Sequence, residues 1–231
     1  MRQRFYFTKN FYEKRAWADG LLTCGVDEVG RGCLAGPLVV GATILHPNSK
    51  YPLLKDSKEL GKEELIRAYN WILKHGWSAI ALISPADIDR YNIWHATLIT
   101  MRQAVLNLLL QDSIPKPSII LVDAMPLSLI NSGYDCLEIQ HFIKGESYSV
   151  SIAAASIVAK VTRDRIMQRY AQHFPAYRWD ENKGYATQAH QEGLRSIGSS
   201  IVHRKTFLKK FAGNQEQQGS IFTTIECEKQ I

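Results

Sequence analysis

The feature that most constrains the fold is the short run Ile119-Ile120-Leu121-Val122, which is continuously apolar and ends on Asp123. Continuous rather than alternating hydrophobicity over so few residues is typical of a strand that is buried on both faces. Such strands occur in α/β proteins, where helices cover each face of the sheet. The sequence therefore predicts an α/β fold in which this strand presents a carboxylate at its end.

A second strand, predicted from Leu21 to Val29, also ends on acidic residues, Asp27 and Glu28. Adjacent strand residues point to opposite faces, so only one of these carboxylates can point straight into a given site. Gly30-Arg31-Gly32 follows, and its glycines allow positive φ and a close backbone approach to a ligand. Taken alone, the pair could equally be a solvated acidic pair before an ordinary turn.

The other predicted elements complete one sheet between helices. Further strands are expected at residues 34–45, 77–83 and 137–143, and helices at 62–74, 92–110, 149–170 and 187–197, with a helical segment starting at Ser84-Pro85 and a loop at Asp180–Tyr185. This order predicts a mixed five-stranded sheet flanked by helices, with the first three strands antiparallel, the last two parallel, and a C-terminal helical extension. We expect a lead-in at residues 1–20, one domain at 21–212 and a polar, mobile tail at 213–231.

Composition limits the class of protein. The 231 residues suffice for one substantial domain, and the net charge of +6 permits an acidic partner such as nucleic acid. No window approaches the roughly 18 apolar residues of a membrane span. The four cysteines form no CxxC pair, so free thiols in a reducing compartment are expected. These features predict a soluble, cytoplasmic protein without a membrane partner.

The carboxylates at the strand ends point to a metal site. Strands one and four are often neighbours in α/β sheets, so Asp27 and Asp123 could meet at one edge, with Asp164 on a late helix. Several carboxylates together would repel one another unless a hard divalent cation such as Mg²⁺ or Mn²⁺ neutralised them. Two such ions would suit phosphodiester hydrolysis. The alternatives are that Asp123 caps a turn and that Asp164 forms an ordinary ion pair with Lys160. No HxxxH, HExxH, Walker or GxSxG motif occurs, which argues against zinc hydrolases, nucleotide hydrolases and serine esterases.

Seven motifs in order, covering about residues 22 to 211, resemble bacterial ribonuclease HII. They are Gly25-Val26-Asp27-Glu28-Val29-Gly30-Arg31-Gly32 with Ala35-Gly36-Pro37, Asp56-Ser57-Lys58, Asn92-Ile93 with Ala96-Thr97, Val122-Asp123, Lys144-Gly145, residues 154–164, and Lys183-Gly184-Tyr185 with His203-Arg204. The resemblance implies a ribonuclease H-like fold and an endonuclease that cuts 5′ to a ribonucleotide, in RNA–DNA hybrids and at ribonucleotides embedded in duplex DNA. It also implies two-ion catalysis that leaves 3′-hydroxyl and 5′-phosphate ends, and a role in ribonucleotide removal and RNA primer degradation.

The resemblance assigns roles to individual residues. Asp27, Glu28, Asp123 and Asp164 are the implied catalytic and metal-binding carboxylates. Gly30-Arg31-Gly32 is expected to contact the ribose 2′-hydroxyl, and Tyr185 to stack on a sugar at the RNA–DNA junction. The implied contacts to backbone phosphate are Lys58, Lys160, Arg163, His203 and Arg204.

The sequence departs from the family pattern at two positions. Glu146 stands where the family usually has Asp, and Thr206 where it often has Ser. Either Glu146 or Asp164 could therefore be the fourth acidic residue, and we favour Asp164 because a helix places a ligand more rigidly than a glycine loop.

Two rival functions remain, one an enzyme and the other a binding domain. A ribonuclease HIII-like enzyme would prefer hybrids, but about 20 residues before strand one leave no room for its extra domain. A non-catalytic nucleic-acid-binding domain would not carry an acidic cluster, because carboxylates repel phosphate.

We expect a monomer that acts on RNA–DNA hybrids and ribonucleotide-containing duplex DNA, with a weak sliding-clamp contact through Gln218-Gly219-Ser220-Ile221-Phe222.

Overall fold

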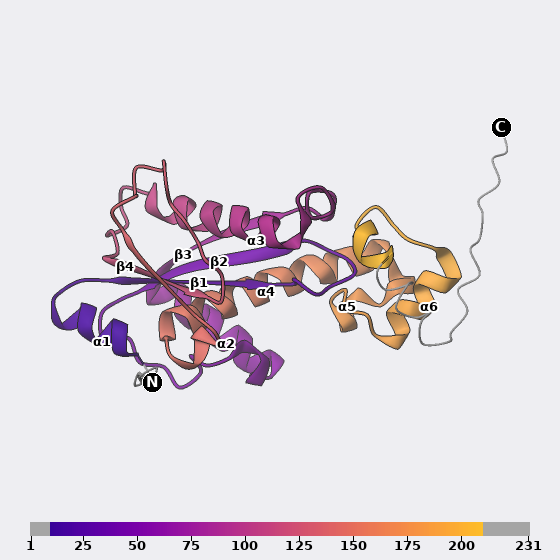
Figure 1. Cartoon of the computed structure of the whole chain (residues 1–231). Coiled ribbons are helices and arrows are strands. Elements are labelled where there is room, and N and C mark those ends of the chain that lie inside the picture. Colours follow the sequence, from indigo (N-terminus) through magenta and orange to yellow (C-terminus); the bar gives the residue numbers. More distant parts are fainter. Residues whose placement is uncertain (1–9, 210–231) are drawn as a thin grey trace, which may run out of the picture.

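The computed structural model describes residues 10–209. Its centre is a five-stranded sheet in the order β3-β2-β1-β4-β5 (Figure 1). The strands are β1 (Thr23–Val29), β2 (Leu38–Leu45), β3 (Gly76–Ile83), β4 (Ile119–Asp123) and β5 (Glu138–Phe142). β1, β2 and β3 pair antiparallel, whereas β4 lies parallel to β1 and β5 parallel to β4. The predicted mixed sheet is therefore confirmed, strand directions included.

Helices cover both faces of this sheet (Figure 1). α3 (Pro85–Leu109) packs on one face against β2 and β3. α4 (Val150–His173) crosses the other face over β1 and β2, with α2 (Lys62–Lys74) beside it. The first four residues of β4 are buried, as the continuous apolar run predicts for a strand enclosed by two helical layers.

Two glycines let α4 lie close to the sheet. A Cβ on Gly25 would come within 2.0 Å of the Ser151 backbone, and one on Gly41 within 2.4 Å of the Ala155 carbonyl oxygen. No side chain fits in either place, so glycine is required where the helix crosses β1 and β2. The close approach sets the height of α4 above the end of β1, where Asp27 lies.

The long helix α3 is broken at Asn92, which has φ 62° and ψ 163°. The Asn92 side-chain oxygen accepts hydrogen bonds from the backbone N–H groups of Trp94 (3.0 Å) and His95 (3.2 Å). Asn92 thus caps the second part of the helix in the manner of an N-cap residue. This explains why the sequence predicts two helical segments here.

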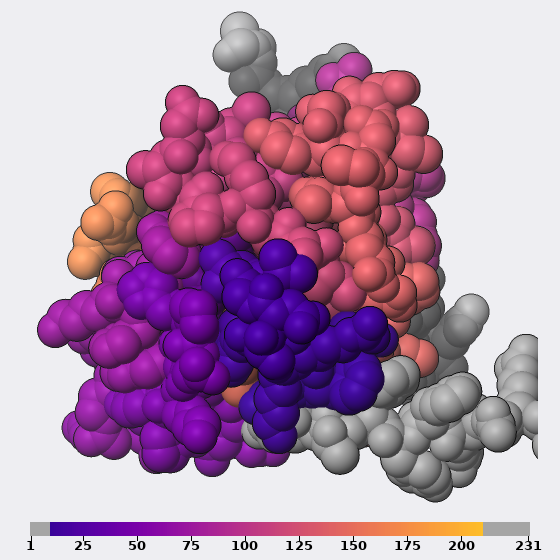
Figure 2. Space-filling model, turned by 90° about the vertical axis from the view of Figure 1, so that its left-hand side faces the viewer, coloured from indigo at the N-terminus to yellow at the C-terminus, as the bar shows by residue number. Residues whose placement is uncertain are grey.

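A helix also forms within the predicted lead-in. α1 is Phe11–Ala18, and its fully buried Glu13 accepts hydrogen bonds from the Ser149 hydroxyl and from the Ser151 backbone N–H (3.2 Å). A carboxylate at the N-terminus of α4 is favourable because it faces the positive end of the helix dipole. Figure 2, which views the left-hand end of Figure 1, shows α1 (indigo) filling the space between the purple and pink segments.

The chain continues past α4 into a helical extension away from the sheet (Figure 1). The extension contains η3 (Pro175–Tyr177), α5 (Trp179–Asn182) and α6 (Gln188–Ile197), so the predicted loop at Asp180–Tyr185 begins as a short helix. The predicted tail, residues 213–231, lies outside the described residues. Among residues 10–209, no helix combines the length and hydropathy needed to cross a membrane.

Candidate active site

The ends of β1 and β4 open into a cleft of about 670 Å³. β1 and β4 are parallel neighbours, so their C-terminal ends lie at the same edge of the sheet and bring Asp27, Glu28 and Asp123 to one place. The convergence expected from the sequence is present. The residues that line the cleft are Asp27, Glu28, Val29, Gly30, Arg31, Gly32, Ser57, Lys58, Leu60, Leu65, Asp123, Ser156, Lys160 and Tyr185.

Asp27 is the most deeply placed carboxylate, with 6% of its surface exposed. Its Oδ1 accepts a hydrogen bond from the Glu28 backbone N–H at 2.7 Å, and the Ser156 hydroxyl of α4 also interacts with it. Burial, followed by the charge of Glu28, raises the pKa of Asp27 well above its usual range. Ser156 in turn lies 3.1 Å from the Ser57 hydroxyl, so two serines from distant segments support this carboxylate.

Glu28 lies beside Arg31, whose guanidinium is 3.4 Å from its Oε1. Its other oxygen, Oε2, is buried without a hydrogen-bond partner among the described residues. Burial raises the pKa of Glu28 to about 7, against the opposing effect of Arg31 and together with repulsion from Asp123. An anionic Glu28 at neutral pH therefore needs an additional positive charge in the cleft.

Asp123 is tied to the turn that carries Glu146. Its Oδ1 accepts a hydrogen bond from the Gly145 backbone N–H at 2.7 Å, in the short helix η2 (Gly145–Ser147). Burial raises the pKa of Asp123, and burial also raises the pKa of Glu146, to which Asp123 adds repulsion. Glu146 is 8% exposed and its Oε2 has no hydrogen-bond partner in the described structure. Glu146 is thus electrostatically linked to the carboxylate cluster.

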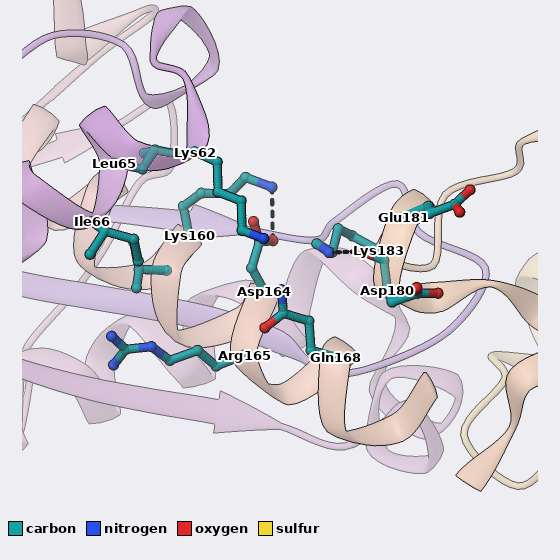
Figure 3. Close-up of a pocket in the computed structure, with 11 residues that line it drawn as sticks. Lys62, Leu65, Ile66, Lys160, Asp164, Arg165, Gln168, Asp180, Glu181 and Lys183 are labelled. Carbon is teal, nitrogen blue, oxygen red and sulfur yellow. Dashed lines mark hydrogen bonds and ion pairs between the residues drawn. The ribbon is translucent and has the colours of Figure 1, made fainter. Parts of the chain in front are cut away.

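Asp164 lies elsewhere. It lines a neighbouring pocket of about 380 Å³ with residues of α2 and α5 (Figure 3), and its carboxylate forms a 2.8 Å ion pair with Lys160. Neither Asp164 nor Glu146 is among the main causes of the raised pKa of Asp27, Glu28 or Asp123, but repulsion from Asp123 helps to raise the pKa of Glu146. Neither Asp164 nor Glu146 lines the cleft itself, so which of them is the fourth carboxylate stays a prediction. Glu146 follows Gly145, whose N–H binds Asp123, and its pKa is raised by Asp123, so we propose Glu146 alongside Asp164 as a candidate and now favour Glu146.

The donor set fits a hard divalent cation. All the acidic ligands are oxygens, their pKa values are raised together, and Glu28 and Glu146 each keep a buried oxygen without a partner. Within residues 10–209, no three histidine, cysteine, aspartate or glutamate side chains are already arranged to hold an ion as a set. An open site of this kind suits Mg²⁺ or Mn²⁺, which take water and phosphate oxygens as their remaining ligands.

Two predicted phosphate contacts prove to be buried. Arg163 and Arg204 are fully buried, and their guanidinium groups donate to backbone carbonyls. Arg163 reaches the carbonyls of Ala35 (3.1 Å), Pro37 (2.9 Å) and Lys183 (2.8 Å). Arg204 reaches those of Gly36 (2.9 and 3.1 Å) and Arg31 (2.9 Å). The prediction that they contact substrate phosphate is wrong, because they instead hold the loop that follows Gly30-Arg31-Gly32.

Of the other side chains predicted to contact substrate, three are accessible in the cleft and one is buried. Lys58, Lys160 and the half-exposed Tyr185 line the cleft and face solvent. His203 is 3% exposed and hydrogen-bonded inside the helical extension, so it is also corrected from a phosphate contact to a buried residue. The sequence did not single out Ser57 or Ser156 as site residues, although the small-residue run around Ser156 signalled a close helix contact.

Known proteins resemble this chain in both sequence and fold. The family model described as Ribonuclease HII matches residues 24–210. Over 197 residues, proteins named Ribonuclease HII from Levilactobacillus brevis and Macrococcus caseolyticus are 45% and 42% identical, covering 85% of this chain and 72% and 69% of the relatives. The ribonuclease HII of Archaeoglobus fulgidus, solved in complex with PCNA, aligns with TM-score 0.66 at 26% identity, over 80% of this chain and 94% of that one. Bst-RNase HIII in complex with Mn²⁺ shares the fold, with TM-score 0.64 at 21% identity, over 85% of this chain and 71% of that one.

The carboxylate cleft is consistent with the sequence match and with the structural match. The family match spans residues 24–210, and the structural match covers 80% of the chain. An ordinary acidic turn at Asp27 and Glu28 is excluded by their convergence with Asp123 across the sheet. The chain therefore belongs to the ribonuclease HII family of RNase H enzymes.

Proposed function

We propose that this chain is an endonuclease that cuts the phosphodiester bond 5′ to a ribonucleotide, in RNA–DNA hybrids and at single ribonucleotides embedded in duplex DNA. The observation that carries this proposal is the cleft in which Asp27, Glu28 and Asp123 lie beside Gly30-Arg31-Gly32 and Tyr185. The products would be 3′-hydroxyl and 5′-phosphate ends. Such an activity suits ribonucleotide removal from DNA and the degradation of RNA primers.

The carboxylates Asp27, Glu28, Asp123 and Glu146 would hold Mg²⁺ or Mn²⁺. A pair of bound ions would supply activation of the attacking water and stabilisation of the departing 3′ oxygen. Ser156 supports Asp27, and the Gly145 N–H fixes one oxygen of Asp123, so the second oxygen of Asp123 stays available. Arg31 keeps positive charge beside Glu28, which favours its ionised form.

The segment Gly30-Arg31-Gly32 would recognise the ribose 2′-hydroxyl. Gly30 has φ +94°, and a Cβ there would meet the Arg163 side chain at 2.3 Å, so glycine is needed for this backbone path. Gly32 has open space around its missing Cβ, which leaves room for a sugar to approach the backbone. Arg204 holds the Arg31 carbonyl from behind, so the segment is prearranged. A rigid backbone at this point can distinguish RNA from DNA by the 2′-hydroxyl.

Tyr185, Lys58 and Lys160 would place the duplex. Tyr185 is 43% exposed at the edge of the cleft and would stack on the sugar at the DNA side of the junction. Lys58 and Lys160 line the same cleft and would contact backbone phosphate.

The first test is metal-dependent cleavage of duplex DNA that contains one ribonucleotide. Asp123→Asn keeps the side-chain shape but removes a charge from the metal site, so cleavage should fall by roughly three orders of magnitude or more while the thermal unfolding curve keeps its shape. Full activity of this variant would contradict the assignment of the cleft. An all-DNA duplex of the same sequence is the control and should remain intact.

Three expectations stay predictions. The clamp contact was predicted for Gln218–Phe222, which lies outside the described residues. The complex of the Archaeoglobus fulgidus ribonuclease HII with PCNA supports looking for such a contact in this chain. A monomeric state and a cytoplasmic location also remain as the sequence predicted them.

A further inference from the structure

Two buried histidines lie behind the substrate cleft without lining it. His190, on α6, is 0% exposed and His203, in the turn that follows, is 3% exposed. Their Nε2 atoms are 3.0 Å apart. Two imidazoles this close can form a hydrogen bond only if one nitrogen carries a proton and the other does not.

The surrounding donors fix which nitrogen carries the proton. The Ser200 backbone N–H points at His203 Nδ1 from 2.9 Å, so that nitrogen is an acceptor and the proton of His203 is on Nε2. The Trp179 indole N–H points at His190 Nε2 from 3.0 Å, so this nitrogen accepts from both Trp179 and His203. The proton of His190 is therefore on Nδ1, and both rings are neutral.

This tautomer leaves one donor that points toward the cleft. His190 Nδ1 lies 2.9 Å from the backbone carbonyl oxygen of Tyr185 and donates to it. The two residues before Tyr185 are held as well, because Arg163 donates to the Lys183 carbonyl and the Leu34 N–H donates to that of Gly184 (2.9 Å). The backbone of Tyr185 is thus fixed between the sheet domain and the helical extension.

We propose that His190, locked in a single tautomer by His203 and Trp179, is a positioning residue that sets the place of Tyr185 in the cleft. This inference rests on the proposed role of Tyr185 at the RNA–DNA junction. His190 touches no reacting group. It acts by holding the carbonyl of the residue that meets the sugar.

Two substitutions at His190 separate positioning from stability. His190→Asn keeps an amide donor near the place of Nδ1, but it leaves the Trp179 and His203 donors buried without an acceptor. His190→Gln keeps an acceptor near the place of Nε2 and loses the donor to Tyr185. We therefore expect the Gln variant to have the higher Tm. The Asn variant should have the higher selectivity for an embedded ribonucleotide over a long RNA–DNA hybrid. A merely structural role would make selectivity follow Tm.

Selectivity is measured as the ratio of kcat/KM at one embedded ribonucleotide to kcat/KM on a long RNA–DNA hybrid. His190→Gln should lower this ratio by up to about tenfold, the size expected for one lost hydrogen bond. His190→Asn should keep it near the wild-type value. His173→Gln, at an exposed histidine on the last turn of α4, is the matched control and should change neither the ratio nor Tm. Either variant alone can test the proposal if the other does not fold. A reduced selectivity ratio for His190→Asn would overturn the proposal, and so would an unchanged ratio for His190→Gln.

A double-mutant cycle with Tyr185→Ala completes the test. If His190 acts through Tyr185, His190→Gln should add nothing to the selectivity loss of Tyr185→Ala. Additive losses would overturn the positioning role while leaving the junction role of Tyr185 intact. If Tyr185→Ala alone does not change the ratio, the junction role itself fails and the inference fails with it. These outcomes therefore distinguish the two ideas.

Discussion

At the scale of single residues, the site consists of carboxylates that would repel one another in the absence of a cation. Burial raises the pKa of Asp27, Glu28, Asp123 and Glu146, and the charge of Asp123 adds to this rise at the other three. Such an arrangement destabilises the folded protein unless positive charge is supplied, so its presence at one sheet edge indicates function.

The choice between Glu146 and Asp164 gives a prediction at this scale. Glu146→Gln removes a charge coupled to Asp123 and should lower kcat by about 100-fold or more. Asp164→Asn removes only the partner of Lys160 in a partly exposed ion pair, so the loss should stay within about threefold. Steady-state cleavage of the single-ribonucleotide duplex measures both. The opposite order would return Asp164 to the metal site.

The residue scale also shows where sequence reasoning succeeds and where it fails. Asp27 and Asp123 were predictable because strand periodicity places them at strand ends and parallel neighbours share an edge. Arg163 and Arg204 were not, because a sequence shows their charge but not the carbonyls from residues 31–37 that surround them. Burial that depends on partners more than 120 positions away has no local signal. The nearness of Glu146 to Asp123 was not predictable either, because it depends on the parallel pairing of β4 and β5 and on the turn that follows.

At the scale of elements, α4 links the chemistry to the helical extension. Glycines on β1 and β2 let it lie against the sheet, where Ser156 supports Asp27, and its next turns carry Arg163 toward the loop of Tyr185. The helix itself was predicted at residues 149–170, whereas α5 was predicted as a loop because four residues carry too little periodicity.

The histidine pair of the extension predicts a pH dependence of stability. Burial, followed by the charge of His190, lowers the pKa of His203 to about 4. The unfolded chain, with a histidine pKa near about 6.5, therefore binds more protons between these values, and stability falls as pH is lowered through this window. The full contribution is about 3 kcal/mol. The buried carboxylates, whose pKa is raised, change the free energy of unfolding with pH in the opposite direction. The contribution of His203 is therefore measured by comparing wild type with a variant that lacks this histidine.

Chemical denaturation at several pH values checks this prediction. The free energy of unfolding of wild type should lose more between about pH 6.5 and pH 4 than that of His203→Gln, because glutamine does not titrate. Parallel pH profiles for the two proteins would show that His203 does not titrate on unfolding in this window.

At the scale of the whole molecule, one cleft is lined by the ends of β1 and β4, by residues 30–32, by residues 57–65, by α4 and by Tyr185. The sheet holds the carboxylates, while the buried Arg163 and Arg204 bind the carbonyls of Pro37 and Arg31 in the loop that we propose to meet the sugar. Metal binding should therefore stabilise the entire domain rather than one loop, because the proposed ligands come from β1, β4 and the turn before α4.

Added Mg²⁺ or Mn²⁺ should raise Tm by about 5 °C when the ion is present at about 100 times its Kd. Differential scanning calorimetry with the ion, and again after chelation, measures the shift. Asp123→Asn should lose most of it, because the variant lacks one charge of the site. An equal shift in both proteins would show that the ion binds elsewhere.

The proposed carboxylate cleft would cut next to a ribonucleotide that Gly30-Arg31-Gly32 recognises. The most direct measurement maps the nick in a duplex that contains one ribonucleotide, with each strand end labelled and with divalent cation present. We expect a single nick 5′ to the ribonucleotide, with a 3′-hydroxyl and a 5′-phosphate, and none with Asp123→Asn. A nick on the 3′ side of the ribonucleotide, or equal cutting of an all-DNA duplex, would contradict it.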